Sequence, residues 1–147
     1  MVVTYTPGMG QDDDARGYLE ALKAVQRQPR VDEREAAALG ETMWRGRWAS
    51  DLVANGAVAE GDGPAHAVAA RGEQARKRLI EGNLRLVVSV ADDYRDRGVP
   101  VAKIIEAGNA GLERAVEQFD WRRAPEFPGY AAAHIREAIA KAIDGHD

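Results

Sequence analysis

Apolar side chains recur along the chain at spacings of three and four residues, the period of an α-helix that buries one side. No segment shows the alternation of apolar and polar residues that marks a half-buried strand. The pattern predicts a long helix over 64–96, in which Leu79 and Leu86 share one face, and further helices over 101–118 and 128–143. We therefore expect an all-α fold, built as a compact helical bundle.

Two more helices are predicted upstream of the long one. The first extends from Asp13 to about Gln28, because its acidic start suits the positive end of a helix and Pro29 ends it. The second begins at Asp32, whose carboxylate can accept a hydrogen bond from the backbone three residues on, while Glu35 reaches back. An Asn-Gly pair then ends this second helix before a glycine-rich loop.

The chain is long enough for one domain. Residues 1–12 are predicted to be a flexible tail, and residues 13–147 a single helical domain. Within that domain, 13–63 contains the upstream helices and loop, and 64–143 contains the core.

The second predicted helix carries two tryptophans, Trp44 and Trp48, one turn apart. Their spacing is compatible with packing against the long third helix and with lining a ligand cavity. We expect the packing.

Composition narrows the classes of function. The chain has no cysteine, which excludes disulfides, thiolate zinc sites and a cysteine nucleophile. Its three histidines are scattered, so we expect no metal site and no cofactor. No apolar run approaches the roughly 18 residues of a membrane helix, and no signal peptide is evident, so we expect a cytoplasmic protein without membrane contact. The net charge of −4 argues against unaided binding to nucleic acid.

Three stretches carry a more specific pattern. They are 81–91 (EGNLRLVVSVA), 105–112 (IEAGNAGL) and 115–120 (AVEQFD). In order and spacing they resemble the second conserved region of primary, sigma-70-type sigma factors of bacterial RNA polymerase. The resemblance covers 75–143, extends weakly upstream from residue 14 into the family's preceding region, and ends before the family's C-terminal domains. It implies the fold of sigma factor domain 2, in a divergent and truncated form.

The resemblance also implies two functional surfaces. In the family, the helix that matches 101–118 docks on the clamp of the polymerase, and the turn and helix after it read and melt the promoter. The docking candidates are Lys103, Glu106, Ala107, Asn109 and Glu113. The candidates for a residual nucleic-acid or ligand face are Trp121, Arg122, Arg123, Phe127, Tyr130, His134, Arg136 and Lys141. On such a face an aromatic side chain stacks on an unpaired base with about 1–3 kcal/mol.

The region that would melt DNA departs from the family pattern. Ala133 and His134 stand where the family usually has two adjacent tryptophans, and Glu137 stands where a glutamine reads a base. Glu126 replaces a lysine. Basic and acidic side chains are equal in number over 121–147, whereas contact with phosphates needs a basic excess. We therefore expect weak or no autonomous DNA binding, and no promoter melting by this chain alone.

Two hypotheses for function stay open. In the first, the protein acts in transcription and docks on the core polymerase clamp, or on a regulator that binds sigma factors. Two residues of the docking face argue against it. Compared with the usual residues of the family, Lys103 inverts a charge and Ala107 removes one. In the second, the sigma fold is a scaffold repurposed as a small-molecule-binding protein or biosynthetic enzyme. The smaller residues of the former DNA-facing groove would then leave a hollow, with a rim of Trp121, Tyr130, His134 and Glu137.

His134 is the weak candidate for chemistry in that second hypothesis, together with Glu137 and Tyr130. Their spacing places these three residues, with Phe127 and Lys141, on one face of the last helix. A histidine one turn from a carboxylate has the makings of an acid–base pair, but no nucleophile accompanies it, so whether the chain is an enzyme stays open. The plainer interpretation is a solvated face with a His–Glu contact. A remnant without a selected role is a third alternative, against which the intact core pattern argues.

Overall fold

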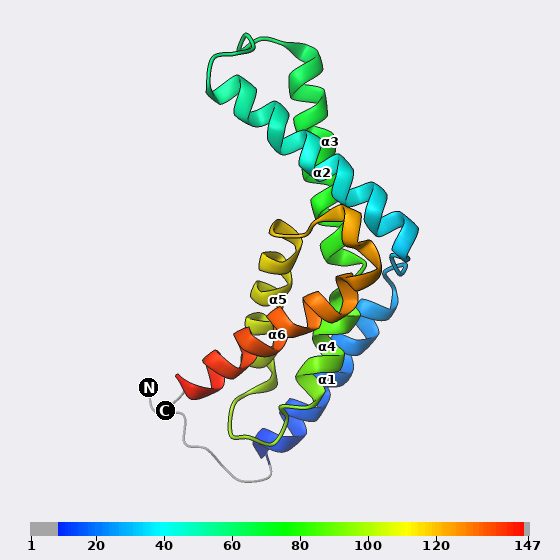
Figure 1. Ribbon diagram of the computed structural model, residues 1–147. Coiled ribbons are helices and arrows are strands. Elements are labelled where there is room, and N and C mark those ends of the chain that lie inside the picture. The colour runs from blue at the N-terminus through cyan, green and yellow to red at the C-terminus, as the bar shows by residue number, and fades with distance from the viewer. Residues whose placement is uncertain (1–8, 146–147) are drawn as a thin grey trace.

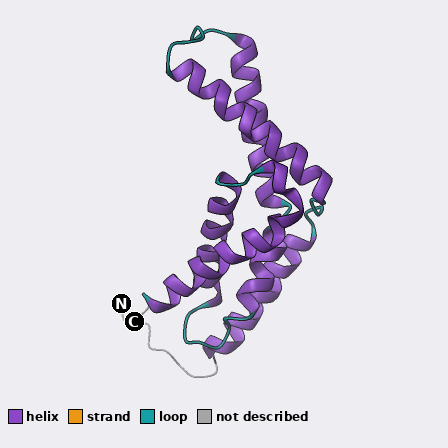
Figure 2. Ribbon diagram, viewed as in Figure 1, coloured by secondary structure: helices purple, strands orange, loops and turns teal. Residues whose placement is uncertain are grey.

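A computed structural model describes residues 9–145 of the chain (Figure 1). This part of the chain contains helices and no strand, so the expected all-α fold is confirmed (Figure 2). The elements are α1 (Met9–Gln26), α2 (Glu33–Ala54), α3 (Gly63–Glu81), α4 (Leu84–Asp92), α5 (Val101–Glu117), the 3-10 helix η1 (Trp121–Glu126) and α6 (Phe127–Asp144). Within residues 9–145, no helix is long and apolar enough to cross a membrane.

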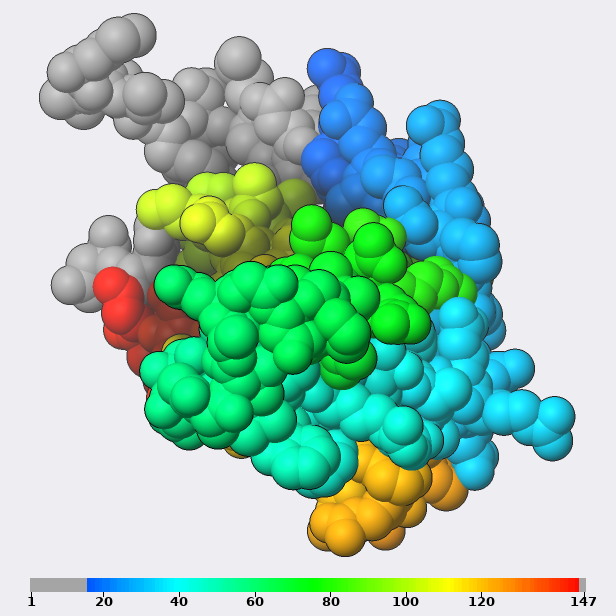
Figure 3. Space-filling model, turned by 90° about the horizontal axis from the view of Figure 1, so that it is seen from above, coloured from blue at the N-terminus to red at the C-terminus, as the bar shows by residue number. Residues whose placement is uncertain are grey.

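The helices form two parts. α1, α4, α5 and α6 pack into a body, and α2 and α3 form an antiparallel hairpin that projects from it (Figure 1). Viewed from above, η1 emerges beside α2 at the base of the hairpin (Figure 3). The deepest core lies in the body, where Ile104, Leu112, Ile135 and Ile139 are fully buried, and Leu79 near the end of α3 reaches the same core.

The start of the first helix differs from its prediction. α1 begins at Met9 rather than at Asp13, so residues 9–12 are helical and the predicted tail is wrong there. The rest of that tail, residues 1–8, lies outside the described residues. Half of the predicted capping box is confirmed, because Asp32 accepts a hydrogen bond from the backbone N–H of Glu35 at 2.7 Å. The Glu35 carboxylate, which was expected to reach back, accepts from Arg78 instead.

The long helix predicted over 64–96 is wrong as one element, because Gly82 and Asn83 divide it into α3 and α4. The Asn83 amide donates to the carbonyl oxygen of Leu79 at 2.7 Å, a local bond that competes with continued helix. A side chain at Gly82 would also collide with Val31, which precedes α2. The break therefore accommodates a neighbouring segment, which the helical period does not reveal.

Two arginines on either side of this break hold the connection between α1 and α2. Arg78 donates to the carbonyl oxygen of Pro29 at 3.0 Å and to both carboxylate oxygens of Glu35 at 3.0 and 3.1 Å. Arg85 donates to the carbonyl oxygen of Gln26 at 2.9 Å, at the end of α1. The last carbonyls of a helix lack partners inside that helix, so Arg85 supplies one from α4.

The exposure of Trp44 and Trp48 contradicts the predicted packing. Their exposed fractions are 56% and 59%. α2 and α3 instead cross where Gly46 faces Gly72, so closely that a Cβ atom on Gly46 would lie 2.7 Å from the Cα of Gly72. Positions two residues apart lie on nearly opposite sides of a helix. The glycine crossing therefore turns both tryptophans outward.

α5 and α6 also approach closely, and a glycine makes this possible. A Cβ atom on Gly111 would lie 2.6 Å from the carbonyl oxygen of His134 and 2.9 Å from the Cα of Ile135, both on α6. Because these neighbours are backbone atoms, they cannot rotate away. The body therefore depends on the absence of a side chain at this position.

We expect Gly111→Ala to lower the free energy of unfolding by about 1–3 kcal/mol, because the added methyl group forces α5 and α6 apart. The measurement is urea denaturation followed by circular dichroism. Gly129→Ala is the matched control, since nothing lies within 4 Å of a Cβ atom there. The control should be neutral or slightly stabilising, because alanine favours a helix over glycine. Equal stability of the two variants would contradict the close approach.

Candidate functional site

The candidate site is organised around η1, which connects α5 to α6 and packs against α2 of the hairpin. Asp120 caps η1 by accepting a hydrogen bond from the backbone N–H of Arg122 at 3.0 Å. On one side, the rings of Phe119 and Phe127 contact each other at a tilt of 59°, with their centroids 4.7 Å apart. On the other side, Gly40 of α2 lies against Trp121, since a Cβ atom on Gly40 would be 2.6 Å from that of Trp121. η1 is therefore held between α2 and α6.

Most basic side chains of the residual nucleic-acid face are bound to nearby carboxylates. Arg122 donates to both carboxylate oxygens of Asp120, at 2.9 and 3.1 Å. Arg123 pairs with Glu126 at 2.6 Å, and Lys141 pairs with Glu137 at 3.1 Å. Arg136 is exposed, and the described residues offer it no ion-pair partner. The face thus presents one basic group whose charge is not locally compensated.

Two of these carboxyl groups have altered pKa values. Hydrogen bonds from the Arg122 side chain and backbone hold the pKa of Asp120 below its usual value. The hydrogen bond and charge of Lys141 likewise lower the pKa of Glu137. Because each pKa is lower in the folded chain than in the unfolded one, each pair contributes at neutral pH and loses its contribution as pH falls through the folded pKa. Both carboxyl groups are exposed, so solvent limits the effect.

Only some of the side chains predicted to share an accessible face of α6 are arranged as expected. Phe127 is 2% exposed and packs inward, so its assignment to an accessible face is wrong. The reason is that Phe119 and the core cover this first turn of α6. Tyr130 and His134 do meet, edge to face, with ring centroids 4.7 Å apart. Glu137, however, pairs with Lys141, and no hydrogen bond joins it to His134 within residues 9–145. The acid–base pair considered for an enzyme is not formed.

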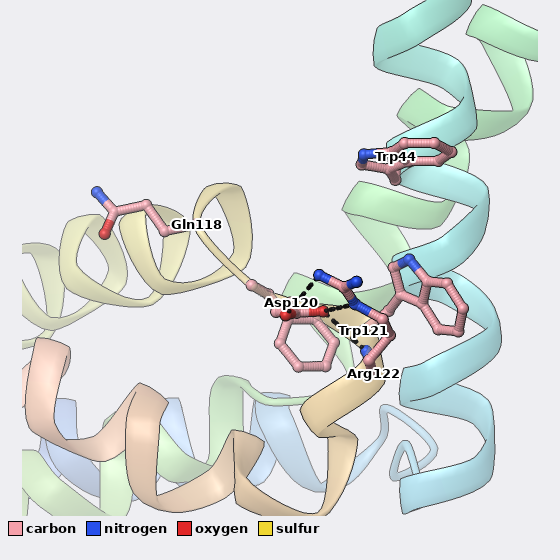
Figure 4. A pocket seen from close by; sticks show the side chains of 6 residues that line it. Trp44, Gln118, Asp120, Trp121 and Arg122 are labelled. Atoms are coloured by element: carbon pink, nitrogen blue, oxygen red, sulfur yellow. Dashed lines mark hydrogen bonds and ion pairs between the residues drawn. The ribbon is translucent and has the colours of Figure 1, made fainter.

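The predicted hollow is replaced by two others. One, of about 280 Å³, lies between η1 and α6 and is lined by Gln118, Phe119, Asp120, Arg123, Glu126, Phe127 and Tyr130. The other, of about 380 Å³, lies between η1 and α2 and is lined by Trp44, Gln118, Phe119, Asp120, Trp121 and Arg122 (Figure 4). Trp121 and Tyr130 thus border different hollows, and His134 and Glu137 border neither.

Sequence reasoning missed Gln118, Phe119 and Asp120, which border both hollows, and Trp44, which borders one. Trp44 is the one of these that lies far away in the chain. It lies on α2, far from Trp121 in the chain, and Gly40 brings the two together. The predicted docking residues stay together on α5, where Lys103, Glu106 and Glu113 are exposed. Ala107 and Asn109 are half-buried. Within residues 9–145, no group of histidine and acidic side chains is arranged to hold a metal ion.

We expect Lys141→Gln to raise the pKa of the Glu137 carboxyl towards its usual value, because the substitution removes the charge of its main partner. The measurement is a carboxyl ¹³C NMR titration. Arg136→Gln removes the same charge from the same helix without touching this ion pair, so it should leave the Glu137 pKa unchanged. A Glu137 titration unaffected by Lys141→Gln would show that the pair does not form in solution.

The sequence of the chain is similar to those of known proteins. Residues 79–147 match the sigma-70 region 2 family. The RNA polymerase principal sigma factor HrdD of Streptomyces griseus is 36% identical over 126 residues, which cover 83% of this chain and 38% of that protein. HrdD of Streptomyces viridifaciens is 37% identical, with the same shares of both chains. The RNA polymerase sigma factor SigA4 of Synechococcus elongatus is 42% identical over 88 residues, which cover 60% of this chain and 28% of that protein. The chain thus spans less than two fifths of the length of these relatives.

Proposed function

The chain belongs to the sigma-70 family of transcription proteins through its region 2, and we propose that it docks on core RNA polymerase without melting promoter DNA itself. A regulator that binds sigma factors is the alternative partner. One contrast carries the proposal: α5 has an exposed face on a firmly packed helix, while three of the four basic side chains of η1 and α6 are paired with carboxylates. A cytoplasmic location is part of the proposal, because core polymerase is found there.

Support for docking comes from the way α5 is held. Ile104 and Leu112 anchor its inner side, and both are fully buried. Glu106 and Glu113, which lie on its outer side, are exposed, and no described residue forms an ion pair with either. Their charges are therefore available to a basic partner surface, and the helix loses little freedom on binding because it is already packed.

Support for the loss of melting comes from α6 and η1. Affinity for a DNA strand depends on cations that neutralise phosphates, and three of the four basic side chains in this segment already pair with carboxylates. Exposed Ala133 offers no ring on which an unpaired base can stack, and His134 is engaged with Tyr130. Both contributions to holding an opened strand are therefore weak.

The docking proposal is tested by co-elution of the purified protein with core RNA polymerase on a sizing column. We expect co-elution that an intact primary sigma factor displaces. Glu106→Lys should weaken it about tenfold, because a charge on the docking face is inverted. Glu20→Lys makes the same change on an exposed site of α1 and should have no effect. Absence of co-elution at micromolar concentrations would reject the polymerase as partner.

The melting proposal is tested by permanganate footprinting of promoter DNA with core polymerase. We expect no opening with the wild-type chain. Ala133→Trp with His134→Trp should also fail, because the restored rings do not change the charge. Adding Glu126→Lys and Glu137→Gln to those two should restore partial opening. Opening by the wild-type chain would overturn the proposal, and opening by the two tryptophans alone would show that charge is not the obstacle.

A further inference from the structure

An apolar patch lies on one side of the hairpin, which projects from the body (Figure 1). It surrounds a hollow of about 460 Å³ that both helices of the hairpin line. Its larger apolar residues are Trp44, Trp48, Leu52, Pro64 and Val68, and we call them the hairpin patch. Pro64 is exposed, and Leu52 and Val68 are half-buried, so the patch is open to solvent.

The packing of the hairpin does not explain the two tryptophans of the patch. α2 buries Met43, Gly46 and Ala49 in this stretch, whereas Trp44 and Trp48 are each more than half exposed. Their rings are neighbours, with centroids 6.0 Å apart. Monomeric soluble proteins rarely expose a large contiguous apolar patch, and adjacent indoles offer a large rigid contact area at low entropic cost. The hairpin patch therefore has the properties of a protein–protein contact surface.

The end of the patch nearer the body is basic. Arg45 borders the hollow and pairs with Glu41 at 2.8 Å, so its charge is compensated. Arg71 lies at the same level on α3, because Gly46 faces Gly72 where the two helices cross. It is exposed, and no described residue forms an ion pair with it. Arg71 therefore gives this end a net positive charge.

The end of the patch at the tip of the hairpin is acidic. Glu60 and Asp62 lie in the loop between α2 and α3, and neither forms an ion pair with a described residue. Asp62 accepts a hydrogen bond from the backbone N–H of Ala65 at 3.0 Å, which holds its carboxylate at the start of α3. The Glu60 side chain is exposed. The two ends of one patch thus carry opposite charges.

We propose that the hairpin patch binds the same patch of a second copy of the chain, in an antiparallel pair with two-fold symmetry. In such a pair the residues of one end meet those of the other end, so the basic end of each copy lies against the acidic end of its partner. A parallel pair would bring like charges together. The charge pattern therefore favours a second copy of this chain as the occupant, in the antiparallel orientation.

The size of the patch is compatible with a dimer of moderate affinity. Two half-exposed indoles can bury roughly 200–300 Å² per copy. This is about a third of the roughly 800 Å² that each partner buries in a stable interface. The smaller apolar residues and the charged ends contribute further area, so we expect a dissociation constant in the micromolar range. The patch is separate from the α5 docking face, and neither surface depends on the other.

Sedimentation velocity of the full chain over a range of concentrations tests the dimer. We expect a monomer at low concentration that converts to a dimer as the concentration rises. Trp48→Ala should weaken the dimer about tenfold or more, because an indole of the patch is lost. Leu19→Ala is the matched control, since Leu19 of α1 is 53% exposed and lies outside the patch. The control should leave the dissociation constant nearly unchanged.

Two charge reversals, Arg71→Glu and Glu60→Arg, test the orientation. Each variant alone should dimerise about fivefold more weakly, because like charges then meet at both ends of the pair. A mixture of the two variants should recover the affinity of the wild type, since opposite charges meet at both ends of a mixed pair. A parallel pair would not be weakened by either reversal, because like charges already meet in it.

A chain that stays monomeric at high micromolar concentration overturns the proposal, and would mean that a different protein covers the patch. Equal loss in Trp48→Ala and Leu19→Ala, or no recovery in the mixture, also overturns it. Dimerisation is measured without the polymerase, so its failure leaves the docking proposal unaffected. Circular dichroism confirms that each variant is folded.

Discussion

The interruption between α3 and α4 determines how the rest of the molecule is arranged. Gly82 leaves space for Val31, and Asn83 satisfies the backbone on the α3 side of the break. From either side, Arg78 and Arg85 then donate to the carbonyls of the α1–α2 connection. Continuous helix here would remove the space for this connection. The hairpin would then lose the anchor that brings α2 against η1.

The anchored hairpin creates the site around η1. Gly40 permits α2 to approach Trp121, and the contact between the Phe119 and Phe127 rings fixes η1 from the side of α6. Two hollows result, one on each side of η1, and they share Gln118, Phe119 and Asp120. Their chemistry differs because one is lined by Trp44 of the hairpin and Trp121 of η1, and the other by Tyr130 and the Arg123–Glu126 pair. A small element between two larger ones thus supports two distinct surfaces.

The two sides of α6 are constrained to different degrees. Ile135 and Ile139 are fully buried, and Gly111 permits the close approach of α5. On the opposite side of α6, Glu137 lies beside Lys141 and balances its charge. Buried positions are constrained by neighbours on every side, whereas exposed positions are not. The fold is therefore a poor guide to whether strand melting survives, and the surface charges are the better one.

The sequence by itself determined the helical class, the cap at Asp32, and the family to which the chain belongs. Each of these features depends on residues that lie close together in the chain, so their spacing in the sequence is enough to predict it. The tertiary structure decided the break at Gly82, the exposure of Trp44 and the burial of Phe127. It also decided that Glu137 binds Lys141 rather than His134. The helical period indicates which residues share a face of a helix. Which element covers that face depends on contacts between segments far apart in the chain.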